Sequence, residues 1–351
     1  MKKNKIILSN KRKISDEDRC FIIAEAGVNH NGSIKLAKKL IDIAVEAKAD
    51  AVKFQTFLAD EIILKKAPKA KYHIETTGPD KKQSWFDLLK SQEINYEMHK
   101  EIIRYCKRKK IIFMSTPYDK KSTDLLDDLG MEIFKIASTD SNNHQLIEYI
   151  AKKKKPIILS TAMCSLDEVE ESVKILKSYL KNKFMIMQCT GSYPAVSSDA
   201  NIRVMQSYKK KFDCLVGYSD HVIENNVALG SIALGAKCFE KHITVSKKLK
   251  GPDHRASMEK KDFIKLVADI RDLELALGDG SKKITSSETS NVKKLKKYFV
   301  AKENIKKGEK FTSENIIAKR TGGLGIKANE YFNLLKKKAK YDFSVNDIIK
   351  I

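Results

Sequence analysis

Short apolar runs rich in β-branched and aromatic residues alternate with longer amphipathic segments along most of the chain. The apolar runs occupy residues 21–24, 51–54, 111–115, 133–136, 156–160, 184–188, 214–217 and 238–242. The segments between them carry apolar residues at helical spacing, as in residues 34–47, 96–107, 166–180 and 263–277. Eight such strand–helix units in about 280 residues predict an α/β fold, a (β/α)8 TIM barrel.

A doubly wound open sheet is the main alternative to the barrel. Such a sheet more usually has five to seven strands and carries a G-x-G-x-x-G turn after its first strand. Residues 27–32 read GVNHNG and do not fit that turn. The pattern therefore favours the barrel.

The composition changes after Leu277. Residues 278–291 are polar and rich in Gly, Ser and Thr, which is typical of a linker. The segment that follows has short β signals and is too small to be more than marginally stable alone. We therefore expect a barrel domain over residues 1–280, a linker over residues 281–293 and a small β-rich domain over residues 294–351.

The chain is strongly basic, with 68 Lys and Arg against 45 Asp and Glu and a net charge of +23. Only eight of the basic residues are arginine, whereas nucleic-acid surfaces usually mix arginine with stacking aromatics. We expect a solvated lysine surface, with steering of an anionic small substrate as an alternative, and no nucleic-acid partner. No apolar run approaches the roughly 18 residues of a membrane span. The N-terminus has no signal-peptide pattern, and the six cysteines form no C-x-x-C pair, so we expect a cytoplasmic protein with no membrane partner.

Charged residues interrupt the apolar strands where a barrel carries its catalytic groups, near the carboxyl ends. Glu25 follows the first run, Lys53 and Gln55 alternate with apolar neighbours in the second, and Lys135 repeats this pattern in the fourth. A buried lysine is costly without an anion, so two inward lysines indicate one multiply charged ligand. A lysine paired with an interior carboxylate is the alternative, as is a salt-bridged loop acid for Glu25.

Other polar residues complete this predicted site. The hydroxyl residues at strand ends, which would add neutral donors for an anion, are Thr116, Ser138, Ser160 and Ser219. His221 and His242 end neighbouring strands and would hold a catalytic divalent metal with open coordination positions, unless they are hydrogen-bonded loop residues. Asp253 follows the last strand, where it would lie over the barrel mouth. These residues predict a metal-assisted enzyme acting on a phosphorylated anion. An aldolase or hydrolase of the same general type is the alternative, as is a non-enzymatic binding protein.

Several segments, in order, resemble the sialic acid synthase family, which includes the N-acetylneuraminate, legionaminate and pseudaminate synthases. They are residues 22–33 (IIAEAGVNHNGS), 52–57 (VKFQTF), 113–119 (FMSTPYD), 134–138 (FKIAS), 155–163 (KPIILSTAM), 189–195 (CTGSYPA), 216–221 (VGYSDH), 240–244 (EKHIT) and 251–258 (GPDHRASM). Residues 302–323 are similar to the family's antifreeze-like SAF domain. The resemblance covers nearly the whole chain.

The resemblance implies a transferase that condenses phosphoenolpyruvate with an open-chain N-acetylmannosamine-type aldose, giving phosphate and a nine-carbon 2-keto acid. His221 and His242 would then hold Mn²⁺ or Mg²⁺. The residues expected to hold phosphoenolpyruvate are Lys53, Lys135, Thr116, Ser138, Ser160 and Ser219. Glu25 would activate the water that adds to the substrate, with Asp140 or Asp253 assisting proton movement.

The acceptor sugar would contact Gln55, Tyr193 and Asp253, and Arg320 would reach its N-acetyl group in the active site of a partner subunit. The expected assembly is thus a homodimer that exchanges SAF domains. Asp140 and Thr321 stand where the family often has Glu and Pro. These departures leave the acceptor open among N-acetylmannosamine, a diacetamido-trideoxy hexose and another six-carbon aldose.

Overall fold

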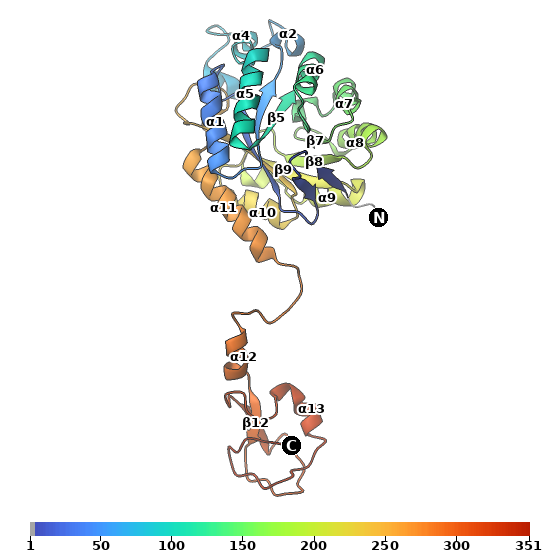
Figure 1. Ribbon diagram of the computed structural model, residues 1–351, viewed down its shortest axis with the longest axis vertical. Coiled ribbons are helices and arrows are strands. Elements are labelled where there is room, and N and C mark those ends of the chain that lie inside the picture. The colour runs from blue at the N-terminus through green and yellow to red at the C-terminus, as the bar shows by residue number, and fades with distance from the viewer. Residues whose placement is uncertain (1–3) are drawn as a thin grey trace. The chain divides into compact units, whose positions relative to one another are not determined.

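The protein is described by a computed structural model over residues 4–351, and it divides into two compact units, the first ending at Gly278 and the second beginning at Asp279. Within the described part of the first unit, eight parallel strands form a nearly closed barrel ordered β5-β4-β3-β10-β9-β8-β7-β6 (Figure 1). They are β3 (Phe21–Gly27), β4 (Ala51–Thr56), β5 (Ile112–Pro117), β6 (Phe134–Ile136), β7 (Ile157–Ser160), β8 (Phe184–Cys189), β9 (Leu215–Asp220) and β10 (Cys238–Thr244). The predicted barrel is confirmed.

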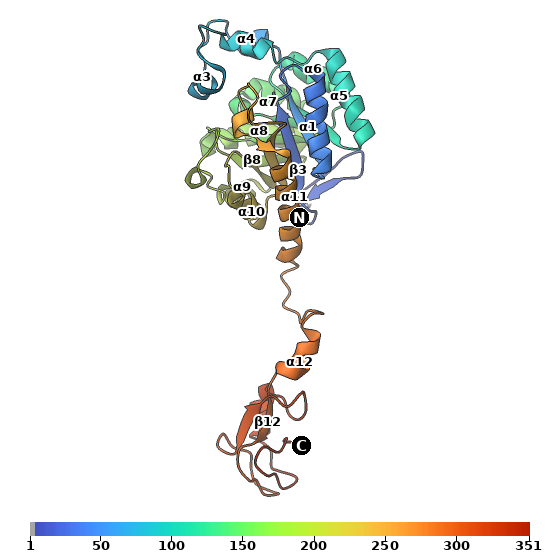
Figure 2. The same cartoon turned by 90° about the vertical axis from the view of Figure 1, so that its left-hand side faces the viewer.

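Helices cover the outside of this barrel, as Figures 1 and 2 show. They are α1 (Ile34–Glu46), α5 (Tyr96–Lys109), α6 (Lys120–Asp128), α7 (His144–Ala151), α8 (Leu166–Leu180), α9 (Val204–Phe212), α10 (Asn225–Ala233) and α11 (Lys260–Leu277). Several begin at side chains suited to capping; Ser33, for example, accepts a hydrogen bond from the backbone N–H of Leu36 at the start of α1. The apolar face of α1, with Leu40 and Ile41, is fully buried.

Side chains alternate along each strand between two apolar layers. Ile22 and Ala24 of β3 face the helices, whereas Phe21 and Ile23 belong to the core inside the barrel. Because the side-chain period of a strand is two, Glu25 continues the inward-facing series. The inward series ends in polar residues at the carboxyl ends, and this positions the site.

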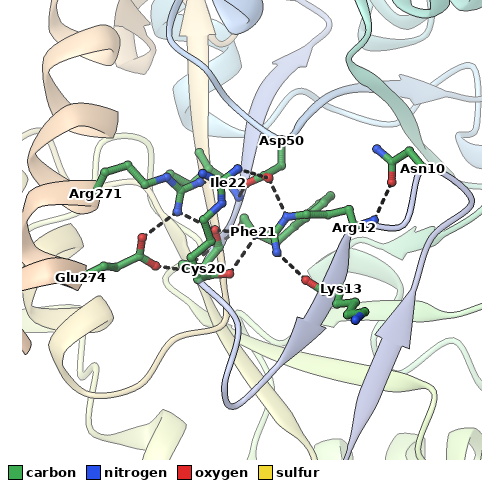
Figure 3. Close-up of polar contacts among 10 residues, drawn as sticks. Asn10, Arg12, Lys13, Cys20, Phe21, Ile22, Asp50, Arg271 and Glu274 are labelled. Atoms are coloured by element: carbon green, nitrogen blue, oxygen red, sulfur yellow. Dashed lines mark hydrogen bonds and ion pairs between the residues drawn. The ribbon is translucent and has the colours of Figure 1, made fainter. Parts of the chain in front are cut away.

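The amino end of the barrel is closed by a hairpin of β1 (Lys5–Ile7) and β2 (Lys13–Ser15), whose Ile6 and Ile14 join the interior core. Figure 3 shows the polar contacts next to it, where Asp50 lies between two arginines. One Asp50 oxygen is 2.7 Å from Arg12 Nε, and the other is 2.9 Å from Arg271 Nη2. Asp50 therefore ties the segment before β3 to the last barrel helix.

A long segment between β4 and α5 contains three short helices, α2 (Ala59–Ile62), α3 (Lys71–Thr77) and α4 (Trp85–Lys90). In Figure 2, α3 and α4 lie close together. Three further short elements follow other strands: the 3-10 turns η1 (Ser138–Asp140) and η2 (Ser197–Asp199) and the turn η3 (His254–Ala256), which leads into β11 (Met258–Glu259).

The second unit is small and β-rich, as predicted. It contains α12 (Thr289–Leu295), an antiparallel pair of β12 (Tyr298–Ala301) and β13 (Ile316–Lys319), the 3-10 turn η4 (Ala328–Glu330) and α13 (Tyr331–Leu334). Its own core includes Phe299, Ile305, Phe311 and Phe343. In residues 4–351, no helix is both long and apolar enough to cross a bilayer.

Candidate active site

A cavity of about 370 Å³ lies at the carboxyl ends of the barrel strands. Every barrel strand, or the loop after it, contributes to its lining. The predicted site residues that line it are Glu25, Lys53, Gln55, Thr116, Lys135, Ser138, Ser160, Tyr193, Ser219, His221, His242 and Asp253. Side chains more than 200 residues apart in the sequence therefore share one cavity, because parallel strands end at the same edge.

Lys53 lies at the centre of a buried charged cluster. Its Nζ atom is 2.8 Å from Glu25 Oε2 and donates a 3.0 Å hydrogen bond to Thr116 Oγ1. Glu240 Oε1 lies 3.5 Å from Lys53 Nζ and 3.3 Å from Lys135 Nζ. Both lysines therefore have interior carboxylate partners, the alternative that the sequence left open. The positive charges of the two lysines and the negative charges of Glu25 and Glu240 can therefore neutralise one another before any ligand binds.

Sequence reasoning missed Glu240. The signal was present, because Glu240 precedes His242 by two residues and must share its face of β10. Lys241, between them, faces the other way and pairs with Asp220, 2.7 Å from its Nζ. Glu240 is 3% exposed, and its Oε1 also accepts a hydrogen bond from Ser219 Oγ at 3.3 Å.

The two carboxylates of the cluster differ in basicity. Burial raises the pKa of Glu25 to about 7, because the cost of desolvating the carboxylate outweighs the attraction of Lys53. The negative charge of Glu240 raises this pKa further. Burial also acts against ionisation of Glu240, but the charges of Lys135 and Lys53 outweigh it and lower the pKa of Glu240 to about 2. Glu240 is thus the permanent counter-charge, and Glu25 is able to exchange a proton near neutral pH.

The strand-end hydroxyls differ in their partners. Ser138 Oγ accepts a 2.9 Å hydrogen bond from the backbone N–H of Ala162 and lies 3.2 Å from Cys189 Sγ. Among the residues that the structure describes, Ser160 Oγ is buried without a hydrogen-bond partner. A buried unpaired hydroxyl is costly, so Ser160 has capacity for a ligand.

His221 and His242 converge at the mouth of the barrel, with ring centroids 5.6 Å apart. His221 Nδ1 lies 2.6 Å from the carbonyl oxygen of Thr190. Since a carbonyl only accepts, this nitrogen carries the proton and Nε2 keeps its lone pair, the arrangement that metal-binding histidines use. Burial lowers the pKa of His221 to about 4, and burial together with the charge of His221 lowers the pKa of His242 well below its usual range.

The histidine pair fits a divalent cation with open positions. Both imidazoles are neutral at physiological pH, and His242 Nδ1 is a buried nitrogen without a hydrogen-bond partner among the described residues. Asp253 Oδ2 lies 3.9 Å from that nitrogen. In residues 4–351, no group of three His, Cys, Asp or Glu side chains is arranged as a metal site. Two histidine ligands would leave a metal held here with positions for oxygen atoms of substrate or water.

Polar groups for a neutral substrate lie next to the histidines. The ring of Tyr193 is 4.1 Å from that of His221, and Gln55 Nε2 donates to Glu25 Oε1 at 3.3 Å. A methyl group built on Gly27 would contact Gln55, Glu25 and Asp253 at 3.4–3.5 Å, which shows that these three side chains meet over this glycine. Burial raises the pKa of Asp253 to about 6.

One predicted residue of the first unit does not line the cavity, and another belongs to the second unit. Asp140 lies in η1, where its oxygens accept hydrogen bonds from Asn143 at 3.0 Å and Thr139 at 3.4 Å. Arg320 belongs to the second unit, is exposed, and has no hydrogen-bond or ion-pair partner in the part of the chain that the structure describes. Of the two acids predicted to assist proton movement, only Asp253 is in the cavity.

The segment between β4 and α5 supplies cavity residues to which the sequence assigned no role. They are Ala70, Tyr72, His73, Trp85, Leu88, Leu89 and Gln92. Three of them, Trp85, Leu88 and Leu89, follow the helical spacing i, i+3 and i+4 within α4, so the sequence indicated that they share one face, and Gln92 follows in the turn after the helix. That this face lines the cavity, however, was decided by the tertiary fold.

The fold and the cavity define a barrel enzyme with its active site at the carboxyl ends of the strands. The chain matches the NeuB family over residues 40–282. It is 43% identical to an N,N'-diacetyllegionaminic acid synthase of Campylobacter jejuni, over 95% of this chain and 99% of the relative. It is 38% identical to a synthase of the same name from Legionella pneumophila, over 93% and 92% of the two chains. A crystal structure of N-acetylneuraminic acid synthetase from Leptospira borgpetersenii, in complex with citrate, matches with a TM-score of 0.72 at 35% identity, over 83% of this chain and 95% of the other. The chain belongs to the NeuB family and is an enzyme of the sialic acid synthase type, which confirms the predicted resemblance.

Proposed function

We propose that this enzyme condenses phosphoenolpyruvate with an N-acetylmannosamine-type aldose, releasing phosphate and a nine-carbon 2-keto sugar acid. The observation that carries the proposal is the proximity, in one cavity, of two buried lysines, several strand-end hydroxyls and a histidine pair. The lysines and hydroxyls suit an anionic enol phosphate, because they supply positive charge and hydrogen-bond donors. The histidine pair suits an aldehyde that must be polarised, because it could hold a metal ion.

Phosphoenolpyruvate would occupy the cluster around Lys53 and Lys135. Its charges would be met by both ammonium groups, and its oxygens by hydroxyl donors, which are Thr116, Ser138, Ser160 and Ser219. Glu240 keeps the two ammonium groups close together in the free protein, since its Oε1 is within 3.5 Å of both.

His221 and His242 would hold Mn²⁺ or Mg²⁺. When bound, such a cation would supply Lewis-acid polarisation of the sugar aldehyde. Neutral imidazoles are needed for this, and burial keeps them neutral. Tyr193, which packs against His221 at 4.1 Å and meets His242 edge-on at 5.7 Å, would fix both rings in orientation.

The bond changes follow from the substrates. C3 of the enol forms a bond to the aldehyde carbon, which leaves a cationic centre at C2. Water adds at C2, and Glu25 would take its proton. The bond between C2 and the phosphate oxygen then breaks, phosphate leaves with the bonding electrons, and the hydroxyl proton left on C2 passes to the departing phosphate, so C2 becomes the ketone of the product. Asp253, with its raised pKa, would donate a proton to the new alkoxide, and it is preferred over Asp140 for this role because Asp140 is not among the residues that line the cavity.

The acceptor would contact Gln55, Tyr193 and Asp253. Similarity to two relatives named N,N'-diacetyllegionaminic acid synthase supports a diacetamido-trideoxy hexose over N-acetylmannosamine. We also propose that two chains form a dimer in which Arg320 of an SAF-type unit contacts the acceptor bound by the partner, since this exposed arginine has no partner in the described part of its own chain. The enzyme would work in the cytoplasm, where phosphoenolpyruvate is available.

Release of phosphate from phosphoenolpyruvate in the presence of Mn²⁺ tests the proposal. N-acetylmannosamine and 2,4-diacetamido-2,4,6-trideoxymannose are compared as acceptors, with Lys53→Met as the inactive variant and Lys110→Met, at an exposed residue of the α5–β5 turn, as its control. Acceptor-dependent release that is lost only in the Lys53 variant would support the condensation. If neither sugar gives release and phosphoenolpyruvate does not raise the melting temperature, the anion site has been misassigned.

A further inference from the structure

The cavity has a second end, away from the histidine pair, formed by α3 and α4. A series of ring contacts leads to it: His221 to Tyr193 at 4.1 Å, Tyr193 to Tyr72 at 5.8 Å, Tyr72 to His73 at 3.9 Å and His73 to Trp85 at 4.9 Å. With the aldehyde of the proposed acceptor at the histidines, the remote substituents of the same sugar would extend toward this end.

Three polar atoms at this end are buried and have no hydrogen-bond partner within residues 4–351. They are His73 Nδ1, Trp85 Nε1 and Gln92 Oε1. The side chains of Gln92 and His73 are more than nine-tenths buried, at 3% and 7% exposure. Unpaired buried polar groups are rare because each costs about 1–3 kcal/mol. At the end of the cavity where the condensation is proposed, Ser160 Oγ and His242 Nδ1 are also buried without a hydrogen-bond partner among the described residues. We therefore interpret the unpaired atoms near α3 and α4 in the same way, as contacts for a ligand.

The chemistry of these atoms fits a secondary amide. Trp85 Nε1 can only donate, as an amide carbonyl requires, and Gln92 Oε1 can only accept, as an amide N–H requires. Ala70, Leu88 and Leu89 add apolar surface for a methyl group.

No lysine, arginine, aspartate or glutamate from the described segment 58–92 lines the cavity. Lys69, which is nearby and buried, donates instead to the carbonyl of Gly78 at 3.0 Å. Burial lowers the pKa of His73 to about 4, with the charge of Lys69 adding to the effect, so this ring is neutral. A phosphate or carboxylate substituent would therefore be desolvated here without a counter-charge, which disfavours a phosphorylated acceptor.

We propose that Trp85, Gln92 and His73 form a subsite for a second acetamido group of the acceptor, carried on a carbon remote from the aldehyde, most simply C4. The inference rests on the proposed condensation and specifies its acceptor. These residues discriminate a 4-acetamido from a 4-hydroxy sugar because an acetamido group offers a carbonyl to the indole, an N–H to the glutamine and a methyl group to the apolar surface, whereas a lone hydroxyl leaves that apolar surface uncovered.

The test uses two acceptors that differ only at C4: 2,4-diacetamido-2,4,6-trideoxymannose and 2-acetamido-2,6-dideoxymannose. The measured quantity is the ratio of their kcat/KM values for phosphate release. Trp85→Phe removes the indole donor but keeps an aromatic ring, and Gln92→Met removes the amide acceptor at similar volume. Each is expected to lower the ratio roughly 3- to 10-fold, the effect of one hydrogen bond. Phe86→Leu, at the next position of α4 and outside the cavity lining, is the control and leaves the ratio unchanged.

The outcomes separate the two proposals. A wild-type enzyme that prefers the 4-acetamido sugar, with the preference reduced in both variants, supports the subsite. If both sugars react and the variants lower the two kcat/KM values equally, the subsite is overturned and the condensation stands. No phosphate release with either sugar overturns both. Melting temperatures of the variants, with and without phosphoenolpyruvate, establish that any loss arises in a folded enzyme with an intact anion site.

Discussion

Glu240 Oε1 lies 3.5 Å from Lys53 Nζ, and the same oxygen lies 3.3 Å from Lys135 Nζ. One carboxylate thus holds two buried ammonium groups together in the free enzyme. A bound anion would share these ammonium groups with Glu240 rather than find them unpaired. The free protein tolerates the lysines because of this pairing, and the site remains strongly attractive to a multiply charged substrate.

Replacing Glu240 with Gln should destabilise the free protein by about 3 kcal/mol, because two buried lysines lose their permanent counter-charge. Inorganic phosphate should then raise the melting temperature of this variant more than that of the wild type, since it restores the missing charge. Asp220→Asn, which breaks the buried pair with Lys241 outside the cavity, is the control and should gain no extra stabilisation from phosphate. Equal phosphate effects in all three proteins would contradict this role of Glu240.

Activity should depend on the protonation of Glu25. A base must be deprotonated to act, so kcat/KM should fall as the pH drops below about 7 and level off above it. Glu25→Gln should lower kcat by about 10²- to 10⁴-fold and remove this step from the pH profile. Titration of the substrate phosphate would persist in the variant, so a step that survives Glu25→Gln would assign the pH dependence to phosphoenolpyruvate instead.

Removal of the metal should abolish turnover if His221 and His242 hold a cation. Dialysis against a chelator is expected to stop phosphate release, and added Mn²⁺ should restore it. His221→Ala should show little recovery at Mn²⁺ concentrations that saturate the wild type, whereas His144→Ala, at a half-exposed position on α7, should recover fully. Undiminished activity in the chelator would remove the metal from the proposal.

Asp50, whose contacts Figure 3 shows, should stabilise the barrel without affecting its chemistry, because it directly precedes β4 at the amino ends of the strands, whereas the cavity lies at their carboxyl ends. Asp50→Asn leaves Arg12 and Arg271 without their shared counter-charge and should reduce the free energy of unfolding by about 3 kcal/mol. Urea unfolding measures this loss, and the exposed pair of Lys265 and Asp269 provides the control, for which Asp269→Asn should cost less than about 0.5 kcal/mol. A changed KM for phosphoenolpyruvate in Asp50→Asn would contradict the separation of the two ends.

Much of the fold and of the candidate site followed from local patterns. The eight apolar runs correspond to β3 to β10, and the helical segment 166–180 coincides with α8. The alternation of strand side chains was enough to predict that Lys53 and Lys135 face the interior, since that period is set by backbone geometry alone. The ends of parallel strands meet at one edge, so the shared location of these residues also followed from the sequence.

The tertiary structure decided which of these groups became partners. The pairing of Glu240 with both lysines depends on the register between β10, its neighbours and the far side of the barrel, which no local pattern encodes. The same holds for α3 and α4, whose short sequences permit several positions until they pack over the mouth. It also holds for Asp140 and Asp253, two acids of equal promise in the sequence, of which only one lines the cavity. Strand periodicity is a property of neighbouring residues, whereas burial, counter-charge and pKa arise only when distant segments exclude water together.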